Sequence, residues 1–112
     1  MNDIWALPSG EWIVYSDEAD IIRDFQALAE LKVVTSYHGI FKKHRAVQFR
    51  FQDGEDLLKY ICFVSGFNYG QVVRLLKHPG TRYNDMFVGS VHQYALFNEA
   101  AEPRRKKKRK QI

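Results

Sequence analysis

The amino-acid sequence predicts an α+β fold, in which helices pack on a small, largely antiparallel sheet of three strands. Two patterns indicate this class: β-rich segments with alternating apolar residues, and stretches in which apolar residues recur every three or four positions. A chain of 112 residues with 46% hydrophobic residues is long enough for one modest core. We therefore predict a single globular domain over residues 1–102 and a basic tail over residues 103–112.

The three strands are expected where β-rich residues cluster: about residues 11–16, 32–38 and 45–52. In the last of them, Val47, Phe49 and Phe51 share one face, so this face should be buried. The other face of the same strand offers Gln48 and Arg50 and no aromatic ring. The second and third strands should form a hairpin with a basic turn.

The helices are expected at about residues 17–31, 54–65, 69–78 and 84–101. Ser16 or Asp17 is a candidate cap for the first helix, and Asp53 for the second. Residues 86–97 also fit a strand pair bent at Gly89, although the helix formers in ALFNEAAE favour a helix. As a strand, this segment would complete the split β-α-β arrangement of ferredoxin-like folds.

Charge is distributed unevenly along the chain. Residues 1–31 hold seven acids against a single basic residue, whereas residues 32–52 hold five basic residues and no acid. The tail has seven of the 17 Lys and Arg residues, so residues 1–102 carry a net charge of 10 − 13 = −3. Such asymmetry suits a polyanionic partner that approaches from one side.

No pattern indicates an enzyme, a metal site or a cofactor. The four histidines form no i,i+4 pair, and no glycine-rich phosphate loop or nucleophile motif is present. Cys62 alone cannot form an internal disulfide, which favours a reducing compartment such as the cytoplasm. The N-terminus lacks the features of a signal peptide, and no apolar run is long enough to span a membrane. We expect a non-enzymatic intracellular protein without catalytic residues.

The segment LLKYICFVSGFNYGQVVRLLK (57–77) resembles a helix-turn-helix. Cys62 stands where the helices would cross, and Gly66 stands at the turn. In this interpretation, the outer face of the second helix presents side chains suited to phosphates and base edges: Asn68, Gln71, Arg74 and Lys77. The basic hairpin turn would add Lys42, Lys43 and Arg45 to the same contact surface.

The segment HRAVQFRFQDGEDLLKYI also resembles the third strand and second helix of RNA-recognition modules. Those modules stack bases on aromatic residues of the exposed sheet face. Because Phe49 and Phe51 share a face with Val47, they are expected in the core instead. The resemblance implies a topology, and binding of RNA on the sheet face is not favoured.

The tail PRRKKKRKQI contains consecutive basic residues that cannot form a core: Arg104, Arg105, Lys106, Lys107, Lys108, Arg109 and Lys110. Contacts between these residues and phosphates would release counterions and make affinity salt-dependent. KKKRK also resembles a nuclear-localisation signal, which would act in a eukaryotic cell. Neither a lipidation motif nor an adjoining amphipathic helix indicates a membrane partner.

Together these features predict a small accessory or regulatory protein that binds nucleic acid, with DNA favoured over RNA. The helix pair and the hairpin turn would form the contact surface, and the tail would supply non-specific affinity. The alternative is a protein-interaction module, an inhibitor or adaptor, in which the tail only localises the protein or adds non-specific affinity. The sequence indicates neither an oligomeric state nor a base preference.

Overall fold

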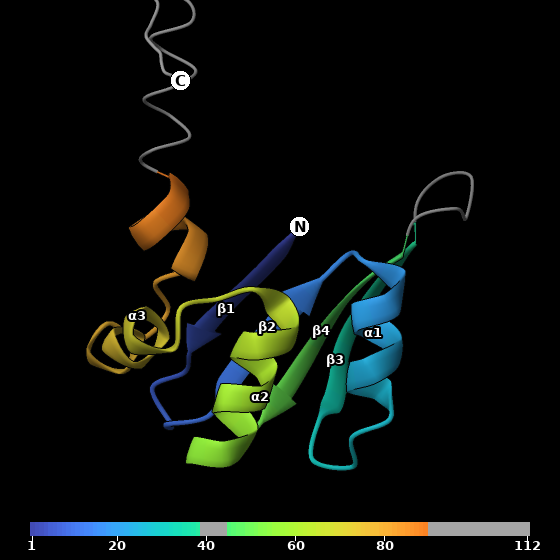
Figure 1. Ribbon diagram of the computed structural model, residues 1–112, viewed down its shortest axis with the longest axis horizontal. Helices are drawn as coiled ribbons and strands as arrows, with labels where there is room; N and C mark the ends of the chain where they lie inside the picture. The colour runs from blue at the N-terminus through green and yellow to red at the C-terminus, as the bar shows by residue number, and fades with distance from the viewer. Residues whose placement is uncertain (39–44, 90–112) are drawn as a thin grey trace, which may run out of the picture.

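The structure is a computed structural model, and it describes residues 1–38 and 45–89 (Figure 1). Its strands are β1 (Asn2–Ala6), β2 (Trp12–Ser16), β3 (Lys32–His38) and β4 (Arg45–Phe51). Its helices are α1 (Ala19–Gln26), α2 (Glu55–Ser65), α3 (Tyr69–Arg74), the 3₁₀-helix η1 (Leu75–Lys77) and the π-helix η2 (Asn84–Gly89). The predicted α+β class is therefore confirmed.

The sheet has four antiparallel strands in the order β1-β2-β4-β3, so the prediction of three strands was wrong. The additional strand is β1, which pairs with β2 from Asn2↔Ser16 to Ala6↔Trp12. Asn and Asp are poor strand formers, and this obscured the alternation of Asp3 and Trp5 with Ile4 and Ala6. The intervening turn includes Gly10 at φ 89°, a conformation that glycine adopts without strain.

Strands β2 and β3, joined through α1, form a split β-α-β unit with β4 inserted between them. The fourth strand of the sheet comes from the N-terminus, whereas the sequence-based alternative needed a strand at residues 86–97. The described part of that segment belongs to the π-helix η2, and residues 90–97 lie outside the described residues.

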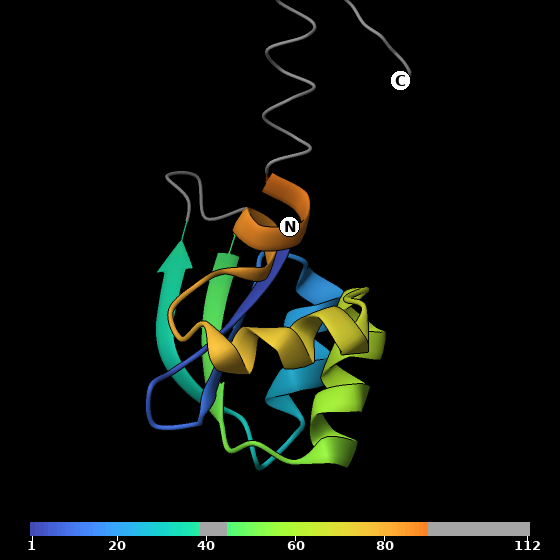
Figure 2. The ribbon, with the colours of Figure 1, turned by 90° about the vertical axis from the view of Figure 1, so that its left-hand side faces the viewer.

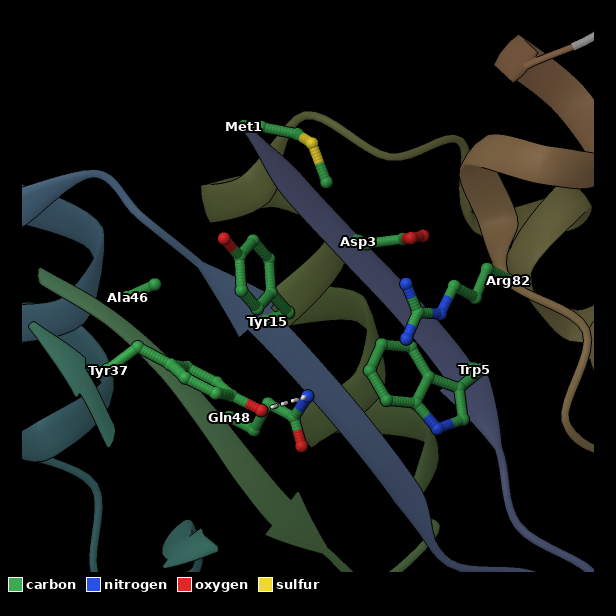
Figure 3. Close-up of a pocket in the computed structure, with 8 residues that line it drawn as sticks. All are labelled: Met1, Asp3, Trp5, Tyr15, Tyr37, Ala46, Gln48 and Arg82. Carbon is green, nitrogen blue, oxygen red and sulfur yellow. Dashed lines mark hydrogen bonds between the residues drawn. The ribbon is translucent and has the colours of Figure 1, made fainter. Parts of the chain in front are cut away.

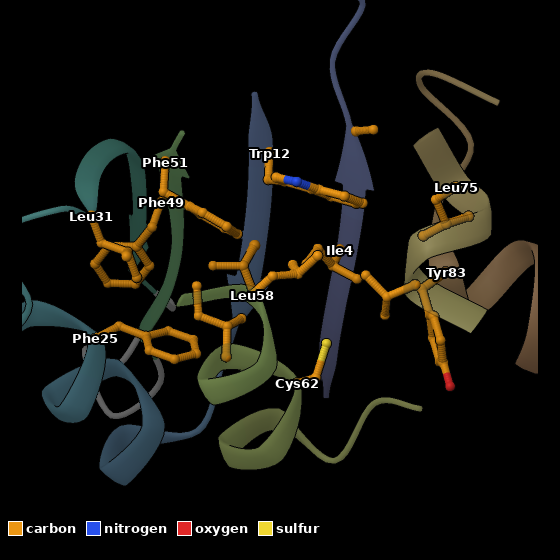
Figure 4. Close-up of a cluster of buried hydrophobic side chains, with 14 of the residues drawn as sticks. Ile4, Trp12, Phe25, Leu31, Phe49, Phe51, Leu58, Cys62, Leu75 and Tyr83 are labelled. Atoms are coloured by element: carbon orange, nitrogen blue, oxygen red, sulfur yellow. The ribbon is translucent and has the colours of Figure 1, made fainter. Parts of the chain in front are cut away.

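Helices α1 and α2 cover one face of the sheet, and the opposite face carries no helix of the described residues (Figure 2). The covered face supplies Trp12, Phe49 and Phe51 to a core that also includes Phe25 of α1 and Leu58 of α2 (Figure 4). Phe25 and Phe49 meet edge to face, with their ring centroids 5.6 Å apart. The predicted burial of Phe49 is confirmed, since its side chain is 0% exposed.

The helix boundaries differ from the sequence-based ranges in the first helix and the last. Helix α1 ends at Gln26 because residues 27–31 reverse the chain into β3 through tight turns, which include a bond from the Leu31 amide to the Leu28 carbonyl. Of the range 84–101, the structure describes only Asn84–Gly89 as helical. Residues 90–101 lie outside the described part of the chain.

None of the predicted caps is at the N-cap position of its helix. Glu18 precedes α1 and Gly54 precedes α2, and neither helix has a side-chain cap bond. Ser16 Oγ accepts from the Glu18 amide at 3.1 Å, which orders the approach to α1. Asp53 Oδ1 instead accepts from Trp12 Nε1 at 2.9 Å. Asp53 thereby satisfies the polar atom of a buried indole.

The turn between α2 and α3 agrees with the predicted pattern. Gly66 ends α2 in the left-handed conformation, at φ 81°. Asn68 caps α3, since its side-chain oxygen accepts from the Gln71 amide at 3.0 Å. Helix α3 has six residues and tightens into η1, which packs beside β1. Helix α3 and η1 therefore lie at the β1 edge of the sheet.

Candidate nucleic-acid interface

The uncovered face of the sheet carries aromatic side chains from three strands. Alternation along the strands places Trp5 of β1, Tyr15 of β2 and Tyr37 of β3 on this face. They surround a hollow of about 310 Å³ (Figure 3). Its lining consists of Met1, Asp3, Trp5, Tyr15, Tyr37, Ala46, Gln48 and Arg82. We name this surface the open face.

On the open face, cross-strand partners form rows that run across the sheet. One row across the sheet reads Trp5, Ile13, Arg50 and Lys32, from β1 to β3. The next row reads Asp3, Tyr15, Gln48 and Thr35. No two of the three rings stack on each other in the described part of the chain. Arg82 lies over the Trp5 ring, so a planar ligand on Trp5 would have to share or displace this contact.

Arg82 brings a positive charge to the edge of the hollow. Its guanidinium carbon lies 4.7 Å from the centroid of the Trp5 ring, a cation–π contact. The residue follows η1, in a loop held to β1 by a bond from the Gly80 amide to the Ala6 carbonyl, at 2.8 Å. Arg82 remains exposed, so its N–H groups can reach a phosphate at the rim.

Asp3 is the acid that lines the hollow, yet it is only 3% exposed. Its Oδ1 accepts from the backbone amides of Ile4 at 2.9 Å and Asn84 at 3.1 Å. Burial raises the pKa of this carboxyl above its usual value, although the two amides and Arg82 oppose the shift. Asp3 is thus directed toward backbone amides of the protein and is almost inaccessible to a ligand.

Glu11 is the second acid on this side of the sheet. Its carboxylate accepts hydrogen bonds from Arg50, including one from Nε at 2.9 Å, and another from Gln52 at 2.8 Å. The bond from Arg50 lowers the pKa of Glu11. The acids of α1, Asp20 and Asp24, are exposed away from the buried Ile22 and Phe25. A third acid, Asp17, lies near Tyr15 and pairs with the N-terminal ammonium of Met1. The acids of the open face are thus paired with cations or, for Asp3, buried.

Of the predicted contact residues, the structure describes Asn68, Gln71, Arg74, Lys77 and Arg45. Helix α3 continues into η1 beside β1, the edge strand of the sheet, whereas Arg45 belongs to β4, between β2 and β3 (Figure 1). Arg45 is exposed on the face covered by α1, with its Nε 3.5 Å from Ser36 Oγ. Lys42 and Lys43 lie outside the described residues, as do Arg104, Arg105, Lys106, Lys107, Lys108, Arg109 and Lys110.

Two residues of the predicted recognition helix have roles within the fold. Asn68 is the cap of α3, and Gln71 Oε1 accepts from the Tyr83 hydroxyl at 2.7 Å. Arg74 and Lys77 are exposed, as expected for the outer side of this helix. Within residues 1–38 and 45–89, Arg74 and Lys77 form no salt bridge, so the helix pair offers these two cations and few groups that could contact bases.

Sequence reasoning missed the aromatic residues of the open face, because it judged this face by a single strand. The strand at 45–51 does lack a ring there, but its neighbours supply Tyr15 and Tyr37. The alternation of Trp12 and Val14 with Ile13 and Tyr15 was the available signal. It could be interpreted only once β2 was known to pair with β4.

Other features of the described residues are neutral with respect to function. No helix within residues 1–38 and 45–89 combines the length and apolarity needed to cross a membrane. The same residues contain no group of three or more His, Cys, Asp or Glu side chains placed to hold a metal ion. Burial raises the pKa of the Cys62 thiol to about 11, so this thiol is a poor nucleophile. Comparisons with protein-family models, curated proteins and solved structures find no match for this chain.

Proposed function

We propose that this protein binds single-stranded nucleic acid across the open face, with the basic tail adding salt-dependent affinity. The observation that carries the proposal is the placement of Trp5, Tyr15 and Tyr37, from three different strands, around one hollow. Aromatic rings on an uncovered sheet are the stacking surface that several single-strand-binding modules use.

The spacing of the rings suits a short run of unpaired bases. Trp5, Tyr15 and Tyr37 lie in three successive rows, so the rings follow a diagonal across the sheet. Neighbouring strands lie about 4.8 Å apart, so β1 and β3 are about 14 Å apart. Each base that stacks on a ring contributes about 1–3 kcal/mol of binding free energy. In a duplex, the base faces are stacked on one another and cannot lie flat on these rings. The open face therefore favours single strands over duplexes.

The charges around the hollow support the same ligand. Arg82 and Lys32 lie at opposite edges of the sheet and are exposed, while Arg50 is paired with Glu11. A strand that crosses from β1 to β3 would pass both free cations. The helix pair is a less suitable contact surface than the sequence indicated, because Asn68 and Gln71 are engaged in hydrogen bonds within the protein.

Binding of a fluorescent ten-nucleotide single strand by Tyr37→Ala tests the proposal. The Tyr37 side chain is 48% exposed and belongs to the open face. We expect this variant to lose about 1–3 kcal/mol of binding free energy, measured by fluorescence anisotropy. Tyr60→Ala is a matched control, since Tyr60 is 42% exposed but lies on α2 in the helical layer. Equal losses in both variants, or none in either, would show that the open face is not the binding surface.

A second candidate function is protein interaction through the helical layer, and one observation favours it. Phe63 on α2 is 85% exposed, a large apolar surface on an otherwise ordinary helix. A partner captured by wild-type protein and by Tyr37→Ala, but not by Phe63→Ser, would support this function. A partner set that is unchanged by Phe63→Ser would argue against it.

A further inference from the structure

We infer that the protein forms a symmetric dimer, in which strand β3 pairs with β3 of a second copy. The inference goes beyond the proposed function and does not depend on it. It concerns the two edges of the sheet, which are the strands β1 and β3. An edge strand has unpaired backbone N–H and C=O groups along its outer side, and these groups can pair with another strand.

The outer side of β1 is closed by other parts of the chain. The Asn2 and Ala6 carbonyls accept from the Asn84 side chain and the Gly80 amide, both at 2.8 Å. Between them, the Ile4 amide donates at 2.9 Å to the side chain of the preceding residue. Residues 2, 4 and 6 alternate along the strand, as expected for groups that turn away from β2. Another strand could add at this edge only by displacing these bonds.

The outer side of β3 is open within residues 1–38 and 45–89. Strand β3 pairs with β4 alone, and no described group outside β4 bonds to its backbone. All of its seven residues except Thr35 are exposed. Three of them, Val33, Val34 and Tyr37, are large apolar side chains that are each about half exposed. Soluble proteins usually cover or pair an edge strand of this length and composition.

An irregularity limits the pairing to the second half of β3. The register with β4 shifts between Val33 and Thr35, and such a bulge hinders the addition of another strand. From Thr35 to His38 the register is regular. Residues 34–37 carry no charge, so two copies of this segment can approach each other without opposing like charges.

The alternation of side chains determines the register between the two copies. Directly opposite residues of an antiparallel pair point to the same face. Thr35 and Tyr37 belong to the open face, and Ser36 belongs to the covered face. A two-fold axis at Ser36 places Tyr37 opposite Thr35 of the second copy, on the same face. An axis at Thr35 would instead place Val33, on the covered face, opposite Tyr37, so we assign the axis to Ser36.

This pairing ends at two copies. Once both β3 strands are paired, the outer strands of the combined sheet are the two closed β1 strands. The two-fold axis is perpendicular to the sheet, so the open faces of both copies lie on one side. Pairing of about five residues per copy is short beside the roughly 20–30 residues of a standard interface. The dimer should therefore be weak and depend on protein concentration.

Disulfide trapping with the full chain tests the register. Ser36→Cys places two thiols opposite each other at the axis, where cross-strand Cβ atoms lie about 4.5–5.5 Å apart. Mild oxidation should convert most of this variant to a covalent dimer. His38→Cys is the matched control, since His38 is also exposed on β3 but would lie about 14 Å along the strand from its own copy. Cys62 is buried and should not react. Equal cross-linking of both variants would overturn the inference.

Sedimentation velocity over a concentration series tests the association itself. The dimer fraction of the wild-type chain should rise with concentration and with salt, because each copy has a net charge of +4 and salt screens their repulsion. Ser36→Lys sets two cations directly opposite each other and should raise the dissociation constant about fivefold. Ser36→Thr should match the wild type. The unfolding transition of Ser36→Lys should also match it, since Ser36 is exposed.

Four results of these measurements would overturn the inference. One is a wild-type chain that remains monomeric at millimolar concentration, and another is a dimer that Ser36→Lys does not weaken. The third is association that requires added nucleic acid and is lost in salt, which would mean that the ligand bridges two copies. The fourth is growth beyond two copies, which would mean that the β1 edge is open as well.

Discussion

Tyr83 contacts the start of α3 through its hydroxyl group and two further aromatic residues through its ring. It donates to Gln71 Oε1 at 2.7 Å and accepts from the Asn68 amide at 3.2 Å, while its ring packs against Phe67 and Phe87. Polar residues that look free in the sequence are thus engaged in hydrogen bonds at the start of α3. At the scale of single residues, burial and hydrogen bonding decide which polar groups remain for a ligand.

Phe49→Ala should lower the free energy of unfolding by about 3–5 kcal/mol. The ring is fully buried and meets Phe25 edge to face, so its removal leaves a cavity and ends that contact. Chemical denaturation measures the change. Val33→Ala is a suitable comparison, because Val33 is the β3 partner of Phe49 but is exposed, and it should cost much less. Similar losses in both variants would contradict the difference in burial between Phe49 and Val33.

Asp3 should make stability depend on pH in the direction opposite to most aspartates. Because burial raises its pKa from an ordinary value of 3.8, the folded chain retains a proton that the unfolded chain releases. Stability from this group is therefore complete below that value and falls as pH rises through the raised pKa.

Asp3→Asn isolates this effect, since it retains the oxygen that accepts from Ile4 and Asn84 and does not titrate. Unfolding free energies of both proteins, measured over a pH series, give the difference directly. The wild-type value should decline relative to Asp3→Asn with rising pH and then level off. If the wild-type free energy of unfolding instead rose relative to that of Asp3→Asn with increasing pH, the carboxylate would be stabilised by its surroundings.

At the scale of elements, periodicity in the sequence predicted most of the helices and strands. Strand β1 and the order of the strands depend on pairing between segments, which periodicity does not reveal. The strand at Lys32–His38 was predicted to the residue, and α2 was predicted to within one residue of its start. Strand β1 was missed because its stability comes from pairing with β2, which no local propensity records. The candidate site was missed for the same reason. Trp5 of β1 and Tyr37 of β3 share a face only because β1 pairs with β2, β2 with β4, and β4 with β3.

The cap of α3 gives a test at this scale. Asn68→Ala should lower the free energy of unfolding by about 1 kcal/mol, because the Gln71 amide loses its acceptor at the helix start. Asn68→Asp retains a capping oxygen and should remain close to wild type. Arg74→Ala, on the exposed side of the same helix, should change stability by no more than about 0.5 kcal/mol. Thermal and chemical unfolding of the three variants would compare them, and a neutral Asn68→Ala would contradict the capping role.

At the scale of the whole molecule, the acids of α1 and α2 and the aromatic open face lie on different layers (Figure 2). A polyanion bound on the open face would be separated by the sheet and core from Asp20, Asp24, Glu55 and Asp56. Under the proposed function, the open face would thus be the side on which these four acids do not oppose a polyanion, even though residues 1–102 carry a net charge of −3.

Deletion of residues 104–112 should leave the domain folded and remove most of its affinity for nucleic acid. The deleted segment carries seven positive charges, and the remaining chain has a net charge of 10 − 13 = −3. Each phosphate that the tail no longer neutralises should reduce the log–log salt slope by about 0.7 for single strands and about 0.9 for duplexes. Salt titrations of the full and shortened chains measure both slopes. Unchanged affinity after the deletion would exclude a binding role for the tail.

The bond between Asp3 and the Asn84 amide spans 81 positions of the sequence. Arg82 likewise reaches its place over Trp5 from far along the chain. During translation, β1 emerges first and these partners emerge last among the described segments, at about 5–20 residues per second. A ribosome-bound chain that has not yet exposed residues 80–84 has the rings of β1 and β2 but not the loop that borders them. If the open face binds nucleic acid as proposed, binding would require the completed domain, and a nascent or truncated chain would not compete for the ligand of the finished protein.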